Sequence, residues 1–336
     1  MWHPVLRFRF WGTLMSLPNV VTDARLEQQR DLRWRGRRRT SPARKAIFRH
    51  LPYLLAMLPA ALLLFLFFVV PVAWALYTSL TDRALLGFGA QETRFIGLAN
   101  YRRLFEYVEF PRIVRNSIVF VIGAAVVGQT GGGLMLALLV RYADRQRIRL
   151  GQIGFAAVII AWITPPLVAG SMWGELLDAY GLVNRLSMTV GLGRLDVLAQ
   201  HPMLSVIVAE AWRGAGLPMI LLLAGLQMIP KSVYEAALVD GAGPLRRLVD
   251  ITLPLIRPQL ALSLMITTIM TMGSFLVILV MTNGDPAFGT ETLALFAFHR
   301  AIGVDFQIGY GAAISTVLLA FNLVFAVAYV RWARER

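Results

Sequence analysis

Long apolar runs separated by short polar segments most constrain how this chain of 336 residues can fold. Lipid cannot hydrogen-bond to backbone groups, so about 20 consecutive apolar residues cross a bilayer as a helix. The runs predict an all-α polytopic membrane protein with six transmembrane helices, at 51–80, 113–140, 151–175, 203–227, 259–282 and 308–330. We expect a break near Pro165–Pro166 and a bend beside Pro218, because proline removes a helical hydrogen bond.

The basic residues predict how these six helices are oriented. Of the 33 lysines and arginines, 23 lie in the tail before residue 51, in 141–149, in the loop after the fourth run and at the C-terminal end. Nine lie in the opposite loops. Cytoplasmic segments carry the excess of Lys and Arg, so both termini are expected in the cytoplasm. The net charge of +14 then reflects orientation and attraction to membrane lipids, and we expect no nucleic-acid partner.

The polar stretch between the fourth and fifth runs predicts two helices joined by a turn. Ser232 and Glu235 form an S-x-x-E capping box, which predicts that the first helix begins there. Gly241 and Gly243 can end it in a left-handed turn, and Pro244 suits the first position of a second helix. One face of the second helix would hold Leu245, Leu248, Val249 and Thr252, and the other Arg246, Arg247 and Asp250. A solvated amphipathic loop fits the same pattern.

This stretch resembles the EAA motif of the permease subunits of binding-protein-dependent ABC importers. The matching residues are Glu235-Ala236-Ala237, Asp240-Gly241-Ala242, Ile251 and Leu253-Pro254. Two other segments resemble sugar-type permeases: Phe95-x-Gly97-Leu98-x-Asn100-Tyr101, and the last outer loop from Asn283 to His299. Asp285 departs from the glycine that many relatives carry in that loop.

The resemblance implies a subunit of an ATP-driven importer in the bacterial inner (plasma) membrane. Its partners would be a dimer of cytoplasmic ATPases, a second and different permease, and a periplasmic or lipid-anchored solute-binding protein. The substrate would be a sugar, an oligosaccharide or a related polyol. A cytoplasmic EAA loop would insert a coupling helix into the ATPase, through Glu235, Ala236, Ala237, Asp240, Gly241 and Ala242. The small Ala236 and Ala237 would let the partner's backbone approach closely.

Three regions follow from the spans and the resemblance together. Residues 1–50 form a basic cytoplasmic tail, in which either Met1 or Met15 could be the true start. Residues 51–112 hold the first transmembrane helix and a periplasmic loop. Residues 113–336 form the permease domain of the importer type.

Polar and aromatic residues inside the spans are candidates for the substrate pathway. Glu210 and Arg213 lie one helical turn apart, and intramembrane charges face a cavity or each other. A mutual ion pair that seals the bundle and a position beside the pathway both fit. The candidate set is Gln129, Trp162, Trp173, Glu210, Trp212, Arg213 and Thr268. Gly128 and Gly132 indicate close helix packing, because no Gly-Lys-Ser/Thr follows to complete a phosphate loop.

The sequence contains no catalytic constellation. It has no Walker A motif and no cysteine, and its four histidines are scattered, so we expect no enzymatic activity, no cofactor and no metal. Three other functions remain open. An ABC permease could carry a peptide or polyamine. An ion-driven transporter would need carboxylates at mid-membrane and an internal repeat. An intramembrane enzyme would need paired catalytic groups.

Overall fold

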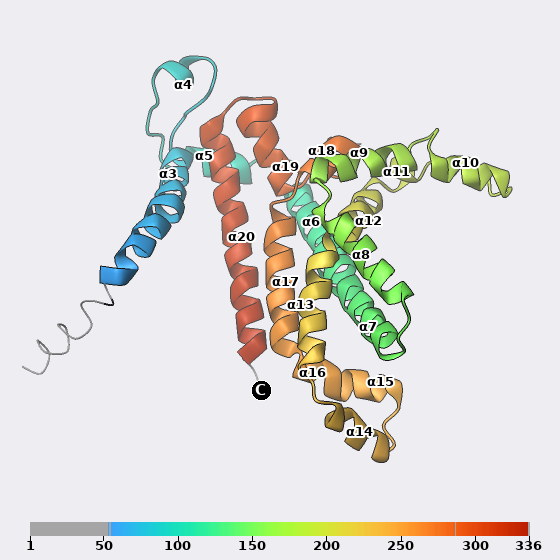
Figure 1. Cartoon of the computed structure of the whole chain (residues 1–336). Helices are drawn as coiled ribbons and strands as arrows, with labels where there is room; N and C mark the ends of the chain where they lie inside the picture. The colour runs from blue at the N-terminus through green and yellow to red at the C-terminus, as the bar shows by residue number, and fades with distance from the viewer. Residues whose placement is uncertain (1–52, 54, 286, 335–336) are drawn as a thin grey trace, which may run out of the picture. The chain divides into compact units, whose positions relative to one another are not determined.

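Helices dominate the computed structural model, which describes residues 53, 55–285 and 287–334 (Figure 1). Within these ranges the one extended pairing is an isolated antiparallel bridge between Thr81 and Phe95. The all-α prediction is confirmed. The basic tail at 1–50 and the choice between Met1 and Met15 lie outside the described residues.

One helix, Leu55–Ser79, forms the first predicted span. It contains a π-helical stretch, η1 (Phe65–Val69), followed by α3 (Val70–Ser79). Its 25 residues are about 38 Å long, enough to cross a hydrocarbon core of about 30 Å. The side chains of 55–69 are all exposed, which suits contact with lipid or another subunit. The chain divides after Val69 into two compact units, Met1–Val69 and Val70–Arg336.

The F-x-G-L-x-N-Y segment closes the C-terminal end of α3. The Nδ2 atom of Asn100 donates to the backbone oxygens of Ser79, at 2.9 Å, and Thr81, at 2.8 Å. The hydroxyl of Tyr101 lies 2.7 Å from that of Ser79. A helix leaves its last four carbonyls without helical partners, so the buried Asn100 satisfies groups that would otherwise be unpaired. Two short helices, α4 (Phe88–Gln91) and α5 (Ala99–Phe105), complete this loop.

The second span is one helix, Phe110–Arg145, of 36 residues. It extends beyond the predicted 113–140 at both ends. Its parts are α6 (Phe110–Phe120), the π-helical η2 (Val121–Gly131) and α7 (Gly132–Arg145). It packs against α12 (Pro202–Gly214), α13 (Gly216–Gln227) and α17 (Arg257–Met272). Its buried faces carry much of the apolar core, including Phe120, Ala124 and Ala137.

Glycines allow this helix to pack closely, as predicted, but not all at the predicted positions. A Cβ atom on Gly128 would overlap the Cβ atom of Ala211 on α12. A Cβ atom on Gly133 would lie 2.6 Å from Cβ of Pro218 on α13. A Cβ atom on Gly132 would have no other atom within 4 Å, so the packing role predicted for Gly132 is wrong. The helical turn between Gly128 and Gly132 is π-helical, which shifts later residues around the axis.

Two predicted spans are interrupted close to their prolines, as expected. The third breaks between α8 (Leu150–Ile163) and α9 (Pro166–Leu177). The segments Gly151–Ile163 and Pro166–Thr189 meet there at 106°. The predicted break at Pro165–Pro166 is confirmed, and a bend this sharp is that of a broken span or a re-entrant loop. The fourth bends by 49° between α12 and α13 at Ala215. The Pro218 ring would clash with the carbonyl of Gly214 in an unbroken helix.

The fifth span is shorter than predicted. Its helix, α17, ends at Met272, and residues 273–275 separate it from α18 (Leu276–Met281), which packs against α9. The prediction of one helix over 259–282 is therefore wrong in its second half. The sixth span is α20 (Ile308–Arg334), slightly longer than the predicted 308–330. Among the described residues three helices pass the length and hydropathy criteria for crossing a membrane, and up to six do if each bent pair is one span.

The remaining helices lie at the two ends of the bundle. At the end where α9 lies are α10 (Leu182–Thr189), α11 (Val197–Gln200), α19 (Leu293–Phe298) and η4 (His299–Gly303) (Figure 1). Two side chains of α6 hold the loop before α19: Asn116 donates to the oxygens of Phe288 and Glu291, and Ser117 Oγ accepts from the Leu293 amide at 2.8 Å.

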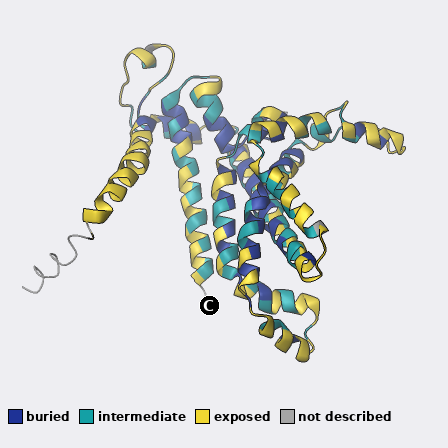
Figure 2. Cartoon of the chain, in the orientation of Figure 1, coloured by how far each residue is buried: buried dark blue, intermediate teal, exposed yellow. Residues whose placement is uncertain are grey.

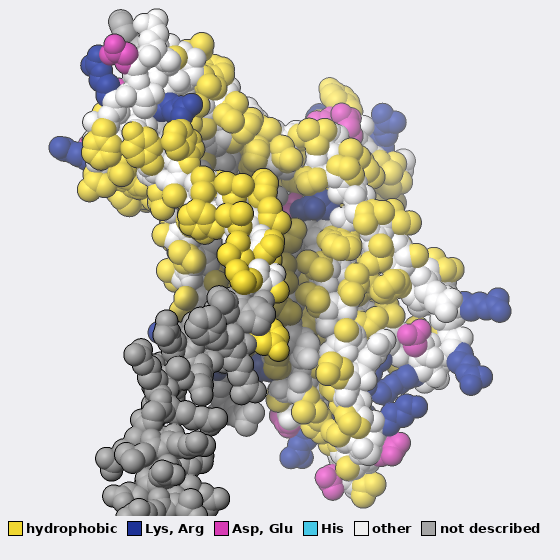
Figure 3. All heavy atoms as spheres, turned by 60° about the vertical axis from the view of Figure 1, so that its left-hand side comes forward, with side chains coloured by type: hydrophobic (Ala, Val, Ile, Leu, Met, Phe, Trp, Pro, Cys, Tyr) yellow, Lys and Arg dark blue, Asp and Glu magenta, His cyan; other side chains and the backbone are white. Residues whose placement is uncertain are grey.

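At the opposite end lie α14 (Lys231–Val239), α15 (Pro244–Arg246), η3 (Arg247–Thr252) and α16 (Leu253–Leu255) (Figure 1). The C-terminal end of α20 lies on the same side, because the Arg257 guanidinium sits 4.9 Å from the Trp332 ring. Buried residues concentrate along the helix contacts (Figure 2). On the face in Figure 3, hydrophobic side chains cover the middle and most charged side chains lie toward the ends.

Candidate coupling loop and intramembrane polar cluster

The loop helix α14 begins two residues earlier than the predicted cap at Ser232 implies. Pro230 occupies the cap position with extended backbone, and Lys231 is the first helical residue. Ser232 therefore lies inside the helix, and its side chain makes no capping hydrogen bond. The predicted capping box is wrong, because the fixed φ of Pro230 sets the helix start before Ser232 is reached.

The end of α14 has the geometry of a Schellman turn. Gly241 has a φ of +72°, and its amide donates to the Leu238 carbonyl at 3.1 Å. The Ala242 amide donates to the Ala237 carbonyl at 2.9 Å. Glycine is favoured at this position because a Cβ atom strains a left-handed backbone. Gly243 has a φ of −66° and needs no such freedom, so the left-handed turn predicted for both glycines holds only for Gly241.

The second arm of the loop is a helix from Pro244 to Leu255 that meets α17 at 74°. Its π-helical section changes which side chains share a face. Thr252 is buried and Leu248 half-buried, as predicted, but Leu245 and Val249 are exposed. A hydrogen bond of 3.1 Å between the hydroxyls of Tyr234 and Thr252 joins the two arms.

Four of the six predicted coupling residues line an open hollow between the two arms, and Glu235 and Gly241 do not. Its volume is about 500 Å³, and it is lined by Val233, Ala236, Ala237, Asp240, Ala242, Arg246, Asp250 and Ile251. Glu235, Ala236, Asp240 and Gly241 are exposed, whereas Ala237 is buried within this chain. Of the two predicted small residues, only Ala236 therefore offers surface to a partner. Ala237 lets the two arms of the loop approach each other.

Sequence reasoning missed three large apolar side chains at the tip of the loop. Val239 is 89% exposed and Leu245 is 73% exposed, and Leu238 is also exposed. Contiguous exposed apolar surface rimmed by polar residues marks an interaction site. The run Ala237-Leu238-Val239 before a glycine turn could have indicated exposed apolar side chains in the sequence, since no single helix face can bury all three.

Inside the bundle, Glu210 and Arg213 form a two-point ion pair. Arg213 Nη2 lies 2.6 Å from Glu210 Oε1, and Arg213 Nε lies 3.3 Å from Oε2. The Glu210 side chain is 1% exposed and that of Arg213 is 15% exposed. The mutual pairing expected for intramembrane charges is present. A buried pair is stable only when both charges are present, so the pair also fixes this end of α12.

Gln129 links three helices beside this ion pair. Its Nε2 atom donates to the Glu210 backbone oxygen at 3.3 Å and to Thr271 Oγ1 on α17 at 3.1 Å. Thr130 and Thr267 make a second link between η2 and α17 at 3.1 Å. The structure therefore brings Gln129, Glu210 and Arg213 together. Sequence reasoning missed Thr271 and Thr130, although polar residues in these spans were a signal for interhelical bonds.

The other candidates lie in separate places. Trp173 and Trp212 contact each other edge to face, with ring centroids 6.0 Å apart. Trp162 lies against Gly216, where a Cβ atom would be 2.6 Å from Cβ of Trp162. Thr268 is buried and its hydroxyl lies 3.1 Å from that of Tyr329 on α20. Gln129 and Thr268 thus hold helices together, and the three tryptophans retain partly accessible surface. Among the described residues, no group of three or more His, Cys, Asp or Glu could hold a metal.

Residues 130–334 match the family described as binding-protein-dependent transport system inner membrane component. The chain belongs to this family. This permease is 32% identical over 288 residues to the sulfoquinovosyl glycerol transport system permease protein SmoG of Agrobacterium fabrum, covering 84% of this chain and 90% of the relative. It is also 32% identical to the trehalose/maltose transport system permease protein MalF of Thermococcus litoralis, covering 84% of this chain and 93% of the relative.

A solved structure shows the same fold. A chain of a bacterial ABC transporter involved in the import of the acidic polysaccharide alginate aligns with a TM-score of 0.69. The alignment covers 88% of this permease and 99% of that chain, at 20% sequence identity. The predicted family resemblance and the all-α permease fold are therefore confirmed, and the loop at 231–255 lies within the family's matched region.

Proposed function

We propose that this permease is one transmembrane subunit of an ATP-driven importer for a sugar, an oligosaccharide or a related polyol. The exposed coupling loop carries the proposal. Ala236 and Asp240 line its hollow, and Glu235 and Gly241 are exposed beside the Schellman turn. The described residues leave the apolar side chains of Leu238, Val239 and Leu245 exposed. A cytoplasmic ATPase dimer would bind this surface, and ATP hydrolysis would occur in that partner.

The loop is built to transmit movement to the bundle. The Tyr234–Thr252 hydrogen bond joins its two arms, so force on α14 also acts on the helix from Pro244 to Leu255. That helix leads directly into α17, which Gln129 and Thr271 link to the second span. Closing of the ATPase pair would therefore move α17 and the second span together.

The substrate class rests on the relatives and on the aromatic residues. The first two relatives are permeases for sulfoquinovosyl glycerol and for trehalose or maltose, and a third, 29% identical, serves sn-glycerol-3-phosphate. Trp162, Trp173 and Trp212 could offer ring faces to sugars, and Arg213 and Glu210 could bond hydroxyl groups when the pathway opens. A second permease subunit would complete the pathway, and a solute-binding protein would deliver the substrate.

We place the coupling loop and the C-terminus in the cytoplasm. The hydrogen bond between Arg141 and Tyr234, at 3.0 Å, puts loop 141–149 on the same side as the coupling loop. The Arg257–Trp332 contact puts the C-terminal end there too. Three of the basic segments counted in the sequence thus gather on one side, which supports a cytoplasmic position for that side.

Affinity purification tests the proposal. The full chain is tagged in its native host, extracted in mild detergent, and the co-purifying proteins are identified by mass spectrometry. An ATPase and a second permease are expected, and Glu235→Arg should remove the ATPase while leaving the second permease. Glu92→Arg, a charge reversal at an exposed carboxylate in another loop, is the control and should retain both.

Transport in vesicles completes the test. Reconstituted complex with a binding protein should take up a sugar or polyol from a panel only when ATP is supplied. A chain that purifies alone and moves solute without ATP would contradict the importer and favour an ion-driven transporter, with Glu210 as the carboxylate to test first.

A further inference from the structure

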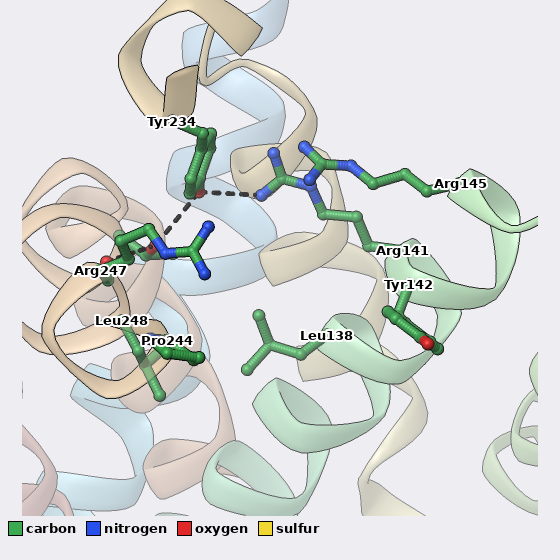
Figure 4. Close-up of a pocket in the computed structure, with 9 residues that line it drawn as sticks. Leu138, Arg141, Tyr142, Arg145, Tyr234, Pro244, Arg247 and Leu248 are labelled. Atoms are coloured by element: carbon green, nitrogen blue, oxygen red, sulfur yellow. Dashed lines mark hydrogen bonds between the residues drawn. The ribbon is translucent and has the colours of Figure 1, made fainter. Parts of the chain in front are cut away.

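A basic pocket lies between the end of the second span and the coupling loop (Figure 4). Its volume is about 340 Å³. Helix α7 contributes Leu138, Arg141, Tyr142 and Arg145, and the two arms of the loop contribute the rest, including Tyr234 and Arg247. In the close-up, the side chains of Arg141 and Arg145 reach toward Tyr234 from one side and Arg247 approaches from the other.

Within the described residues, the three arginines of this pocket form no ion pair with a carboxylate. No acidic residue lines the pocket, and none of the ion pairs found among the described residues includes Arg141, Arg145 or Arg247. The nearby Asp250 pairs instead with Arg246, outside the pocket. Three like charges this close repel one another, so an anion in the pocket would stabilise them.

The contacts that the arginines do make leave donors available. Arg141 donates to the Tyr234 hydroxyl at 3.0 Å, and Arg145 lies over the Tyr234 ring at 5.5 Å. The Nε atom of Arg247 is buried, and the described part of the chain offers it no hydrogen-bond partner. Guanidinium groups present forked donors that match the oxygens of a phosphate group.

The pocket also has an apolar wall beside the arginines. Leu138, Pro244 and Leu248 line it opposite the arginines (Figure 4). Arg145 is the last residue of the long membrane-crossing helix, and Leu138 lies about 10 Å back along that helix, toward its apolar part. Basic groups beside an apolar wall, at the end of an apolar helix long enough to cross a membrane, suit a ligand with a phosphate head and a hydrocarbon body.

We propose that this pocket binds the phosphate headgroup of an anionic phospholipid. The phosphate oxygens accept from Arg145 and Arg247, and the glycerol and upper acyl carbons contact Leu138 and Leu248. The lipid then bridges α7 and the second arm of the coupling loop. Its binding stabilises one arrangement of the loop relative to the second span.

Native mass spectrometry of the delipidated full chain in detergent tests this site. Phosphatidylglycerol, phosphatidylcholine and inorganic phosphate are added in separate titrations. We expect the chain to retain phosphatidylglycerol at a lower lipid concentration than phosphatidylcholine. Arg145→Gln and Arg247→Gln should each weaken the affinity for phosphatidylglycerol by roughly tenfold, the usual effect of a lost charge-assisted hydrogen bond. Arg246→Gln is the matched control, because Arg246 is on the same arm but outside the pocket.

Other outcomes would overturn the proposal. Equal retention of phosphatidylglycerol by Arg145→Gln, Arg247→Gln and the wild type would do so. Displacement of phosphatidylglycerol by millimolar inorganic phosphate would assign the pocket to a free anion instead. Arg145 is exposed and contacts the Tyr234 ring, so Arg145→Gln should retain the fold. A melting curve followed by tryptophan fluorescence checks this. The lipid readout needs no ATPase, so its failure is distinct from failure of the importer proposal.

Discussion

The guanidinium of Arg213 binds both carboxylate oxygens of Glu210, with a shortest distance of 2.6 Å, in the middle of a bundle of apolar helices. Both residues lie on α12, one turn before its bend, so a single helix carries two charges of opposite sign. Burying these two charges costs little free energy of folding only while both are present and paired.

Removing one member of this ion pair should destabilise the bundle more than removing both. Glu210→Gln leaves the half-buried Arg213 unpaired, and Arg213→Gln leaves a buried carboxylate, each at a cost of about 3 kcal/mol. The double variant should recover a large part of that loss. Melting temperatures in detergent, followed by tryptophan fluorescence, measure the effect, and single variants as stable as the wild type would contradict it.

The two glycines of the coupling turn should respond differently to substitution. Gly241→Ala places a side chain on a backbone with φ of +72°, at a cost of about 1 kcal/mol, whereas Gly243→Ala is unstrained at φ of −66°. Neither added Cβ would meet another atom, so backbone strain alone separates them.

Gly241→Asp should go further and abolish ATP-driven uptake while the chain remains inserted in the membrane. Uptake assays and membrane fractionation measure the two effects, with Gly243→Ala as the control that retains uptake. Normal uptake by Gly241→Asp would exclude a role for this turn in coupling to an ATPase.

The glycines of the second span provide a packing test. Gly128→Ala would overlap Ala211 and force η2 and α12 apart, at a cost of about 1–3 kcal/mol, whereas Gly132→Ala meets no atom within 4 Å. Gly132→Ala should equal or slightly exceed the wild type in stability, because alanine favours helix. Equal melting temperatures for the two variants would argue against the close contact.

Glu291 should make the stability of the loop before α19 depend on pH. Burial raises the pKa of its carboxyl above the ordinary value of 4.5, although contact with His299 acts in the opposite direction. A carboxyl whose pKa is higher in the folded state stabilises the protein when the pH is below its pKa in the unfolded state. This stabilisation is lost as the pH rises through the pKa of the folded state. The stability of Glu291→Gln should therefore increase relative to that of the wild type as the pH rises above 4.5.

The difference in melting temperature between Glu291→Gln and the wild type, measured from pH 4.5 to 7.5, checks this. Glu92→Gln, an exposed carboxylate in another loop, controls for removal of one charge. A difference that shrinks as the pH rises would show that His299 and Arg300 outweigh burial.

Several elements could be predicted because their causes are local. Pro165–Pro166 breaks a helix wherever it lies, and the gap between α8 and α9 falls there. Gly241 terminates α14 because glycine tolerates a left-handed backbone. The π-helical stretches could not be predicted, and they changed the faces of Gly132, Leu245 and Val249, because small changes in helical winding depend on tertiary packing.

The sequence by itself determined the membrane-spanning, all-α architecture, the Glu210–Arg213 spacing and the family, because hydropathy, helical periodicity and short motifs are properties of neighbouring residues. Only the tertiary structure decided that Gln129 bonds Thr271, that Asn100 closes the end of α3, and that Arg141, Arg145 and Arg247 line one pocket. Each of these contacts joins residues that are far apart in the chain or on different helices. Their distances depend on how the helices bend and pack, which the spacing along the chain does not specify.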